Sequence, residues 1–311
     1  MWFAAMLPRP GARLSATRAM RRALIVAAPL LLMGCQLAVL DPKGIIGLAD
    51  ETILVDSVAI MLAIVVPTVI ATFAFAWWFR ASNTRAIHLP DWEYSGRIEL
   101  IVWGIPLLVI MLLGGVAWIG SHQLDPAKPL AAKTPPLDIQ AVSLDWKWLF
   151  IYPGQQIASV NELVVPAGVP LHFSLTSASV MNAFFIPQLG SMIYTMNGMR
   201  TQLNLQADAP GDFLGLSAHF SGDGFPNMEF RVHAVAPEQF AAWVARTRQS
   251  GPTLDDKSYA ALAVQSLDTS PFSYRSAAPG LFQEIVAQRL PPGPGPQAGR
   301  PNPSVSPRTK D

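Results

Sequence analysis

The 311-residue chain has little charge and almost no cysteine. Charged residues make up 14% of the sequence, whereas soluble domains carry roughly 25%. The single cysteine excludes an internal disulfide and any metal site that needs two thiolates from this chain. The near balance of 22 basic and 21 acidic residues argues against nucleic-acid binding, which requires clustered positive charge. The hydrophobic fraction of 51% instead indicates a protein that meets lipid.

The first 35 residues have the composition of an export signal. Arginines precede a charge-free apolar run from Ala23 to Met33, which ends at Gly34 and Cys35. Leu32-Met33-Gly34-Cys35 resembles the lipobox of bacterial lipoproteins, which implies cleavage before Cys35 and lipidation of its sulfur. The alternative is a buried free thiol. Because Met20-Arg21-Arg22 would by itself begin a compact signal, translation is expected to start at Met20.

Two longer apolar runs each have the length of a membrane-spanning helix. Val58 to Phe79 provides 22 residues without a charge, and Leu100 to Gly120 provides 21. About 20 helical residues cross a hydrocarbon core of roughly 30 Å, so we expect transmembrane helices over about 54–79 and 99–121. Arginines are concentrated between the runs and acidic residues before the first, which places the loop in the cytoplasm and both flanks outside.

The sequence changes character after a proline- and alanine-rich linker at 123–137. Short β-branched or alternating runs follow, separated by turn signals such as Tyr152-Pro153-Gly154, and this spacing favours a β-sandwich. The expected segments are a signal peptide at 1–34, a membrane anchor at 35–122, the linker, a β-domain at 138–236, a C-terminal helical extension at 237–290 and a disordered tail at 291–311. Within them we expect strands at 139–150, 163–165, 171–175, 202–205 and 230–235, and short helices at 237–246, 254–267 and 280–290.

Four motifs together resemble one family. They are Leu40-Asp41-Pro42-Lys43-Gly44, the run from Asp145 to Pro153, the run from Val180 to Pro187, and Tyr194-Thr195-Met196-Asn197-Gly198-Met199. Following two apolar runs in this order, they resemble subunit II of the haem-copper oxidases, most closely that of the cytochrome bo-type ubiquinol oxidases. The resemblance runs from about Cys35 to Leu290. It implies a two-helix transmembrane hairpin, an exported all-β cupredoxin-like Greek-key sandwich, and short C-terminal helices in which Phe272, Tyr274 and Phe282 resemble an aromatic-rich extension.

The resemblance also shows where the copper ligands of related cytochrome c oxidase subunits would lie. Their binuclear copper centre uses two bridging cysteines, two histidines, a methionine and a backbone carbonyl. The corresponding positions carry Asn182, Ser217, His219, Ser221, Phe225 and Met228, and only Met228 keeps its ligand type. Hydroxyl and aromatic groups do not replace soft thiolate and imidazole ligands, so this chain is expected to hold no copper or other metal.

Other histidines and methionines provide a weaker alternative. A metal site built from His219, Met228 and Met192 is disfavoured, because one imidazole and two thioethers bind cupric or zinc ions poorly. His172 and His233 lie in strand patterns without spaced partners, and we interpret both as structural residues.

Two tryptophans lie in the motif that begins at Asp145. Trp146 and Trp148 are two residues apart and are expected to share one strand face. In copper-bearing relatives aromatic residues of this strand help electrons to enter. Because no copper lies beyond them here, we interpret both as packing residues.

Glu99 lies at the cytoplasmic end of the second apolar run, where an ionisable group is costly without water or a partner. The related family has a glutamate at this place, at the mouth of a proton channel, so the resemblance implies that Glu99 helps protons to enter. The alternative is a solvated carboxylate favoured by the start of a helix. The sequence leaves both interpretations open, and no catalytic residue is expected in this chain.

These features predict a non-catalytic subunit II of a proton-translocating terminal ubiquinol oxidase. The resemblance implies haem-copper subunit I and further small membrane subunits as partners, haem and copper in the partner subunit, and ubiquinol rather than cytochrome c as the electron donor. The expected location is the bacterial inner membrane, as a multi-pass protein with its N-terminus and β-domain on the outer side. A cytochrome c oxidase subunit is opposed by the substituted ligand positions, and a stand-alone lipoprotein with a binding or assembly role is the remaining alternative.

Charge within the β-domain agrees with this prediction. Residues 139–236 contain six acidic and three basic side chains, too few to steer a basic cytochrome. So little charge also leads us to expect a surface covered by another subunit.

Overall fold

The computed structural model describes residues 38–87, 89, 91–132 and 134–293. The chain divides into two units, Met1–Asp41 and Pro42–Asp311. In the first unit the described part contains a 3-10 turn, η1 (Ala38–Leu40). The expected signal peptide, Cys35 and residues 294–311 of the expected tail lie outside the described residues.

Two long helices, α2 (Ile45–Trp78) and α3 (Gly96–Gln123), contain the two apolar runs. Both are long and apolar enough to cross a membrane, and the side chains of their most apolar stretches are not buried within the chain. Such bare apolar surfaces are unfavourable in water and require lipid or neighbouring helices. Two spans form an anchor, and the prediction of a multi-pass protein overstates them.

Helix α2 begins earlier than the apolar run alone predicts, at residue 45 rather than about 54, because its first turn is held by the β-domain. The amide of Lys43 donates a hydrogen bond to the carbonyl of Gln188 over 2.7 Å. A Cβ atom at Gly44 would lie 2.1 Å from the carbonyl oxygen of Gln206, so this close approach requires glycine. Lys43 and Gly44 therefore join the start of α2 to the sandwich.

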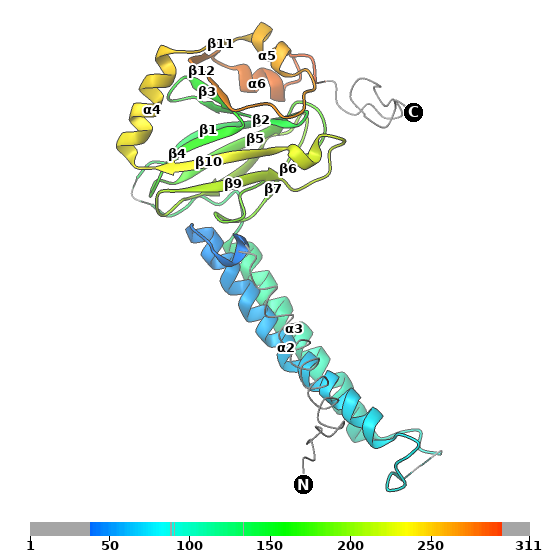
Figure 1. Cartoon of the computed structure of the whole chain (residues 1–311). Helices are drawn as coiled ribbons and strands as arrows, with labels where there is room; N and C mark the ends of the chain where they lie inside the picture. Colours follow the sequence, from blue (N-terminus) through cyan, green and yellow to red (C-terminus); the bar gives the residue numbers. More distant parts are fainter. Residues whose placement is uncertain (1–37, 88, 90, 133, 294–311) are drawn as a thin grey trace, which may run out of the picture. The chain divides into compact units, whose positions relative to one another are not determined.

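The β-domain consists of two packed sheets (Figure 1). The first has the strand order β12-β3-β2-β1-β5-β8 and the second has the order β4-β10-β9-β6-β7, while β11 and β13 form a separate pair. Most neighbours are antiparallel, but three pairs are parallel, namely β1 with β5, β4 with β10 and β11 with β13. The strands are β1 (Leu137–Leu144), β2 (Lys147–Tyr152), β3 (Ile157–Val160), β4 (Glu162–Pro166), β5 (Leu171–Ser177), β6 (Asn182–Phe185), β7 (Ile193–Thr195), β8 (Thr201–Leu205), β9 (Gly211–Ser217), β10 (Glu229–Val235), β11 (Thr253–Leu254), β12 (Phe272–Tyr274) and β13 (Ser276–Ala277). The expected two-helix hairpin followed by a β-sandwich is confirmed.

Aromatic side chains fill the space between the two sheets. The rings of Phe184 and Phe230 stack with centroids 5.2 Å apart, and Trp148 meets Phe184 edge-on at 5.3 Å. All three side chains are buried, and each contributes roughly 1.5–3 kcal/mol or more through its burial. The alternating apolar residues of the strands supply the rest of this inner core.

A second apolar cluster covers the outer face of the first sheet. Val142, Leu149 and Ile151 pack there against Tyr259 and Phe282 of the C-terminal extension. Strand β2 is consequently buried on both faces along its whole length. Part of the low charge of the β-domain therefore reflects a cover that the chain itself provides, rather than another subunit as first expected.

The extension contains three helices close to their expected positions. They are α4 (Pro237–Gln249), α5 (Asp256–Leu262) and α6 (Leu281–Val286). Asp255 caps the start of α5 by accepting a hydrogen bond from the amide of Ser258 over 2.8 Å. The whole of α5 lies within the expected range 254–267.

The assignment of Trp146 and Trp148 to one strand was wrong. A tight turn at Asp145 and Trp146 joins β1 to β2, and Trp146 has a left-handed backbone with φ of 65°. The turn carries no polar signal in the sequence, because Trp146 is buried and the apolar alternation continues through it.

Candidate functional site

Four of the six copper-ligand positions are brought together between β6, β9 and the loop that leads to β10. Asn182 begins β6 and Ser217 ends β9, and these neighbouring strands bring the two side chains into contact. The hydroxyl of Ser217 donates to the amide oxygen of Asn182 over 3.0 Å, and its backbone amide donates to the carbonyl of Met228 over 3.0 Å. The hydroxyl of Ser221 lies 3.9 Å from the sulfur of Met228. All four side chains are buried.

These four side chains form two neutral pairs, Ser217 with Asn182 and Ser221 with Met228. A binuclear copper centre requires cysteine thiolates as bridging ligands. The amide, hydroxyl and thioether groups present here cannot supply them. The donor set therefore does not fit such a centre. These hydrogen bonds hold the loop in a buried site, where unpaired polar groups are costly.

His219 and Phe225 occupy the other two positions and are only partly buried. The ring of His219 packs edge-on against Tyr194, with centroids 5.7 Å apart, and Phe225 packs against Phe220 at 5.6 Å. Among residues 38–87, 89, 91–132 and 134–293, no group of three or more His, Cys, Asp and Glu side chains is placed to hold a metal ion.

Trp146 also contacts this loop. Its indole nitrogen donates to the carbonyl of Ser221 over 3.0 Å. The ring also packs directly on Gly224, since a Cβ atom there would lie 2.3 Å from Trp146 Cδ2. Trp146 is therefore a packing residue that holds the loop at residues 217–228.

The charged residues on either side of Trp146 bind the C-terminal extension. The ammonium group of Lys147 donates to the carbonyl of Val264 over 2.7 Å and to the hydroxyl of Ser266 over 2.5 Å. The carboxylate of Asp145 accepts a hydrogen bond from Gln265 over 3.1 Å. Both charges are almost completely buried, so the hairpin carries an ionic clamp for the extension.

Burial lowers the pKa of Lys147 from 10.5 to about 8, although the nearby carboxylate of Asp145 acts in the opposite direction. Between these two values the unfolded chain binds more protons than the folded chain. The free energy of unfolding should therefore rise by about 2 kcal/mol from about pH 8 to about pH 10. A Lys147→Met variant should lose this rise, which chemical unfolding of the full chain in detergent would measure at several pH values.

The rise in the free energy of unfolding with pH should end near pH 10. Burial raises the pKa values of Tyr152 and Tyr259, so ionisation of these phenols in the unfolded chain lowers stability above about pH 10. If the free energy of unfolding changes with pH in the same way in Lys147→Met and in the parent chain below about pH 10, Lys147 is not the group responsible for the rise.

Glu99 lies in the first turn of α3. Its carboxylate accepts a hydrogen bond from the indole nitrogen of Trp103, one helical turn later, over 2.9 Å. Both side chains are exposed in the isolated chain. The carboxylate is thus held along the helix by a neutral donor, so its charge is available to water or to a partner.

His172 and His233, both predicted to be structural residues without spaced partners, have different surroundings. His172 forms a hydrogen bond of 3.0 Å with Asn204 on the neighbouring strand. His233, for which the sequence showed no spaced partner, lies between the carboxylates of Asp212 and Glu162. Both partners come from other strands, so only knowledge of the strand pairing would have revealed them.

A two-helix anchor, a β-sandwich and a clamped C-terminal extension define a subunit II of the respiratory oxidase type. The family model described as COX Aromatic Rich Motif matches residues 248–293, which include the clamped segment. The chain is 49% identical over 266 residues to ubiquinol oxidase subunit 2 of Acetobacter aceti, covering 85% of this chain and 86% of the relative. It is 46% identical over 265 residues to cytochrome bo(3) ubiquinol oxidase subunit 2 of Pseudomonas aeruginosa, covering 85% and 80%.

The chain belongs to the family of ubiquinol oxidase subunit 2. It is therefore a membrane-anchored subunit of an oxidoreductase complex, with partner subunits such as subunit I, and a stand-alone lipoprotein is not favoured. Among solved structures, the periplasmic domain of subunit II of cytochrome oxidase of Bradyrhizobium japonicum is 26% identical, with a TM-score of 0.36, and the match covers 39% of this chain and 98% of that one.

Proposed function

We propose that this chain is the copper-free subunit II of a proton-translocating complex that oxidises ubiquinol and reduces oxygen to water. The replacement of the two cysteine and two histidine ligands, and the hydrogen bonds that join Asn182, Ser217 and Met228, carry the proposal. A domain without a redox group does not relay electrons. Electrons therefore enter at a partner subunit that holds haem and copper, and this chain binds neither cofactor.

In this proposal the subunit has three roles in the complex. Its helices pack against subunit I and further small subunits, its β-domain caps the complex on the outer side of the bacterial inner membrane, and its second helix contributes to a proton entrance. The arginine-rich loop between the helices supports the orientation. Cleavage before Cys35 and lipidation of its sulfur would add a second attachment to the membrane. Cytochrome c is not a partner in this proposal.

Metal and optical analysis of the purified native complex tests the function. Haem should be present, no copper should be attributable to this chain, and oxygen uptake should depend on ubiquinol. A near-infrared band of a binuclear copper centre, or oxygen uptake driven by cytochrome c alone, would contradict the proposal. Isolation of the chain without any haem-bearing partner would favour a separate lipoprotein.

Glu99 is the residue of this chain that we expect to affect proton movement. Glu99→Gln removes the charge but keeps the shape, and it should slow ubiquinol-dependent oxygen reduction several-fold while lowering proton uptake to the same extent. A pH jump with a membrane-impermeant dye in the reconstituted complex measures the uptake. The matched control is Trp103→Phe, which removes the hydrogen bond to Glu99 but retains the carboxylate. Unchanged uptake and turnover in Glu99→Gln would leave Glu99 as a solvated helix-start residue.

A further inference from the structure

A groove on the outer face of the second sheet contains a histidine that the proposed function does not use. The groove has a volume of about 460 Å³ and lies between the parallel pair β4 and β10 on one side and α4 on the other. Its wall includes Glu162, His233, Trp243 and Arg246. Side chains and solvent therefore meet in a concave site that is separate from the loop at residues 217–228.

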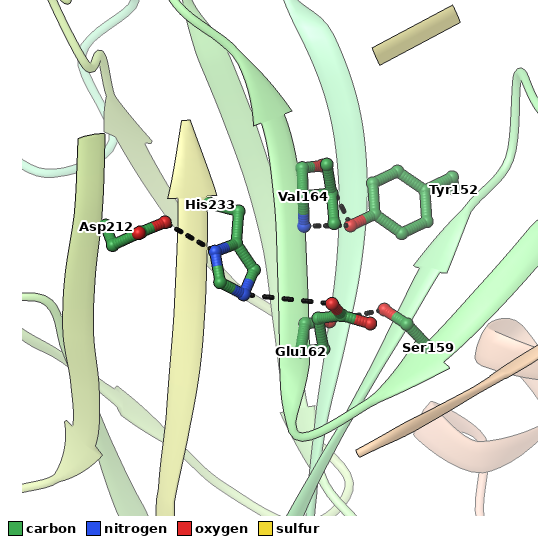
Figure 2. A network of polar contacts seen from close by, with 6 residues as sticks. All are labelled: Tyr152, Ser159, Glu162, Val164, Asp212 and His233. Atoms are coloured by element: carbon green, nitrogen blue, oxygen red, sulfur yellow. Dashed lines mark hydrogen bonds and ion pairs between the residues drawn. The ribbon is translucent and has the colours of Figure 1, made fainter. Parts of the chain in front are cut away.

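The two nitrogens of His233 face two different carboxylates (Figure 2). Nδ1 lies 2.5 Å from Oδ1 of Asp212, and Nε2 lies 3.7 Å from Oε1 of Glu162. When Nδ1–H is donated to Asp212, the neutral imidazole presents the lone pair of Nε2 to Glu162. A carboxylate behind a histidine in this way is the usual support of a metal-ligating imidazole, because it fixes the tautomer and increases the basicity of the ligand.

The distance between Nε2 and Glu162 suits a shared cation. A tetrahedral zinc ion with ordinary bond lengths holds its nitrogen and oxygen ligands about 3.4 Å apart. The observed 3.7 Å requires an adjustment of only a few tenths of an ångström from the partly exposed Glu162 side chain. The groove leaves room for water at the remaining coordination positions.

Side-chain hydrogen bonds hold the backbone of Glu162 and Val164. The hydroxyl of Ser159 donates to the carbonyl of Glu162 over 2.5 Å. The hydroxyl of Tyr152 both donates to the carbonyl of Val164 and accepts from its amide, each over 3.0 Å. Figure 2 shows these contacts beside the histidine. Such supports keep a ligand in place before the ion arrives.

The charges that face the site favour a cation. Asp212 and Glu162 contribute two negative charges, and Arg246 contributes one positive charge at the groove wall. Arg231, on the same strand as His233, lies 4.0 Å from Glu229, which offsets its charge. With a neutral imidazole the local balance is negative before a metal ion binds.

We propose that His233 and Glu162 form a binding site for a divalent transition-metal ion such as Zn²⁺, with Asp212 as the hydrogen-bonded support of the imidazole. The ion takes Nε2 of His233, a carboxylate oxygen of Glu162 and water molecules. Two protein ligands make the site an exchangeable one rather than a structural zinc site with four protein ligands. It is independent of the lost copper centre and involves no sulfur ligand.

Zinc binding to the untagged full chain in detergent tests the proposal. Equilibrium dialysis should show one more bound Zn²⁺ per chain in the parent than in His233→Ala. Asp212→Asn should keep the ion but weaken its affinity about 10-fold to 100-fold. Glu162→Gln should weaken it as well. X-ray absorption of the zinc-loaded chain should show imidazole and oxygen neighbours without sulfur.

His172→Ala and His219→Ala are matched controls, since each removes one imidazole outside the groove. Both should bind as much Zn²⁺ as the parent. The proposal is overturned if His233→Ala binds the same amount, if His219→Ala loses the ion, or if the absorption spectrum contains a sulfur neighbour from a methionine. Should His233→Ala fail to fold, as judged by circular dichroism, Asp212→Asn and Glu162→Gln decide the question by the same measurement.

Discussion

A chain that stops after Gly251 is expected to lose the folded β-domain. The deletion exposes the outer face of the first sheet, where Val142, Leu149 and Ile151 pack against the C-terminal extension. Each re-exposed side chain costs roughly 1.5–3 kcal/mol, and the cluster as a whole exceeds the usual net stability of about 5–15 kcal/mol. It also leaves the buried charges of Asp145 and Lys147 without their partners at residues 264–266, which adds a further penalty. Protease resistance and near-ultraviolet circular dichroism of the detergent-solubilised chain would report the loss.

The matched control is a chain that stops after Gly293. It retains every contact of the extension that the described residues make, so its protease resistance should equal that of the parent. If the shorter chain ending after Gly251 stayed protease-resistant, the extension would not be required for folding. The two-sided burial of β2 would then contribute little to stability.

Gly224→Ala is expected to destabilise the β-domain by about 3 kcal/mol through overpacking. A methyl group at this position would lie 2.3–2.5 Å from three ring carbons of Trp146, which is itself buried and bonded to the carbonyl of Ser221. The burial of the ring and its hydrogen bond to Ser221 oppose the shift that would relieve this clash. Chemical unfolding of the full chain measures the loss.

A double-mutant cycle separates this steric clash from other effects. In a Trp146→Ala background the ring is absent, so Gly224→Ala should cost less than about 1 kcal/mol. Gly154→Ala is a surface control, because a Cβ atom at Gly154 would meet nothing within 4 Å, and its effect should stay within about 0.5 kcal/mol. Equal costs of Gly224→Ala with and without the indole would disprove the steric explanation.

The architecture could be predicted from runs of residues, because the forces that produce it are local in sequence. Charge-free runs specify α2 and α3, and turn residues between alternating runs specify a sandwich. The turn at Trp146 could not be predicted, since a buried residue in a hairpin carries no polar signal. The early start of α2 depends on backbone contacts with residues 188 and 206, which no local pattern records.

For the candidate site, the sequence predicted which residues occupy the copper-ligand positions but not the contacts among them. The positions of Asn182, Ser217 and Met228 followed from the family resemblance, but the hydrogen bonds among them required the pairing of β6 with β9. His233 was assigned a structural role because its partners, Asp212 and Glu162, lie far away along the chain. Strand register creates that cluster, and register depends on the whole sheet rather than on any short stretch.

The ionic clamp also imposes an order on folding. Lys147 binds a carbonyl that lies 117 residues later in the chain, and the edge strand β12 joins the first sheet from the same distant segment. Contacts between such remote residues form late, because the intervening chain must first be made and ordered. During synthesis Lys147 therefore lacks the carbonyl of Val264, and Asp145 lacks its hydrogen bond from Gln265, until that segment emerges. The apolar outer face of the first sheet is therefore covered only after the end of the chain has been made.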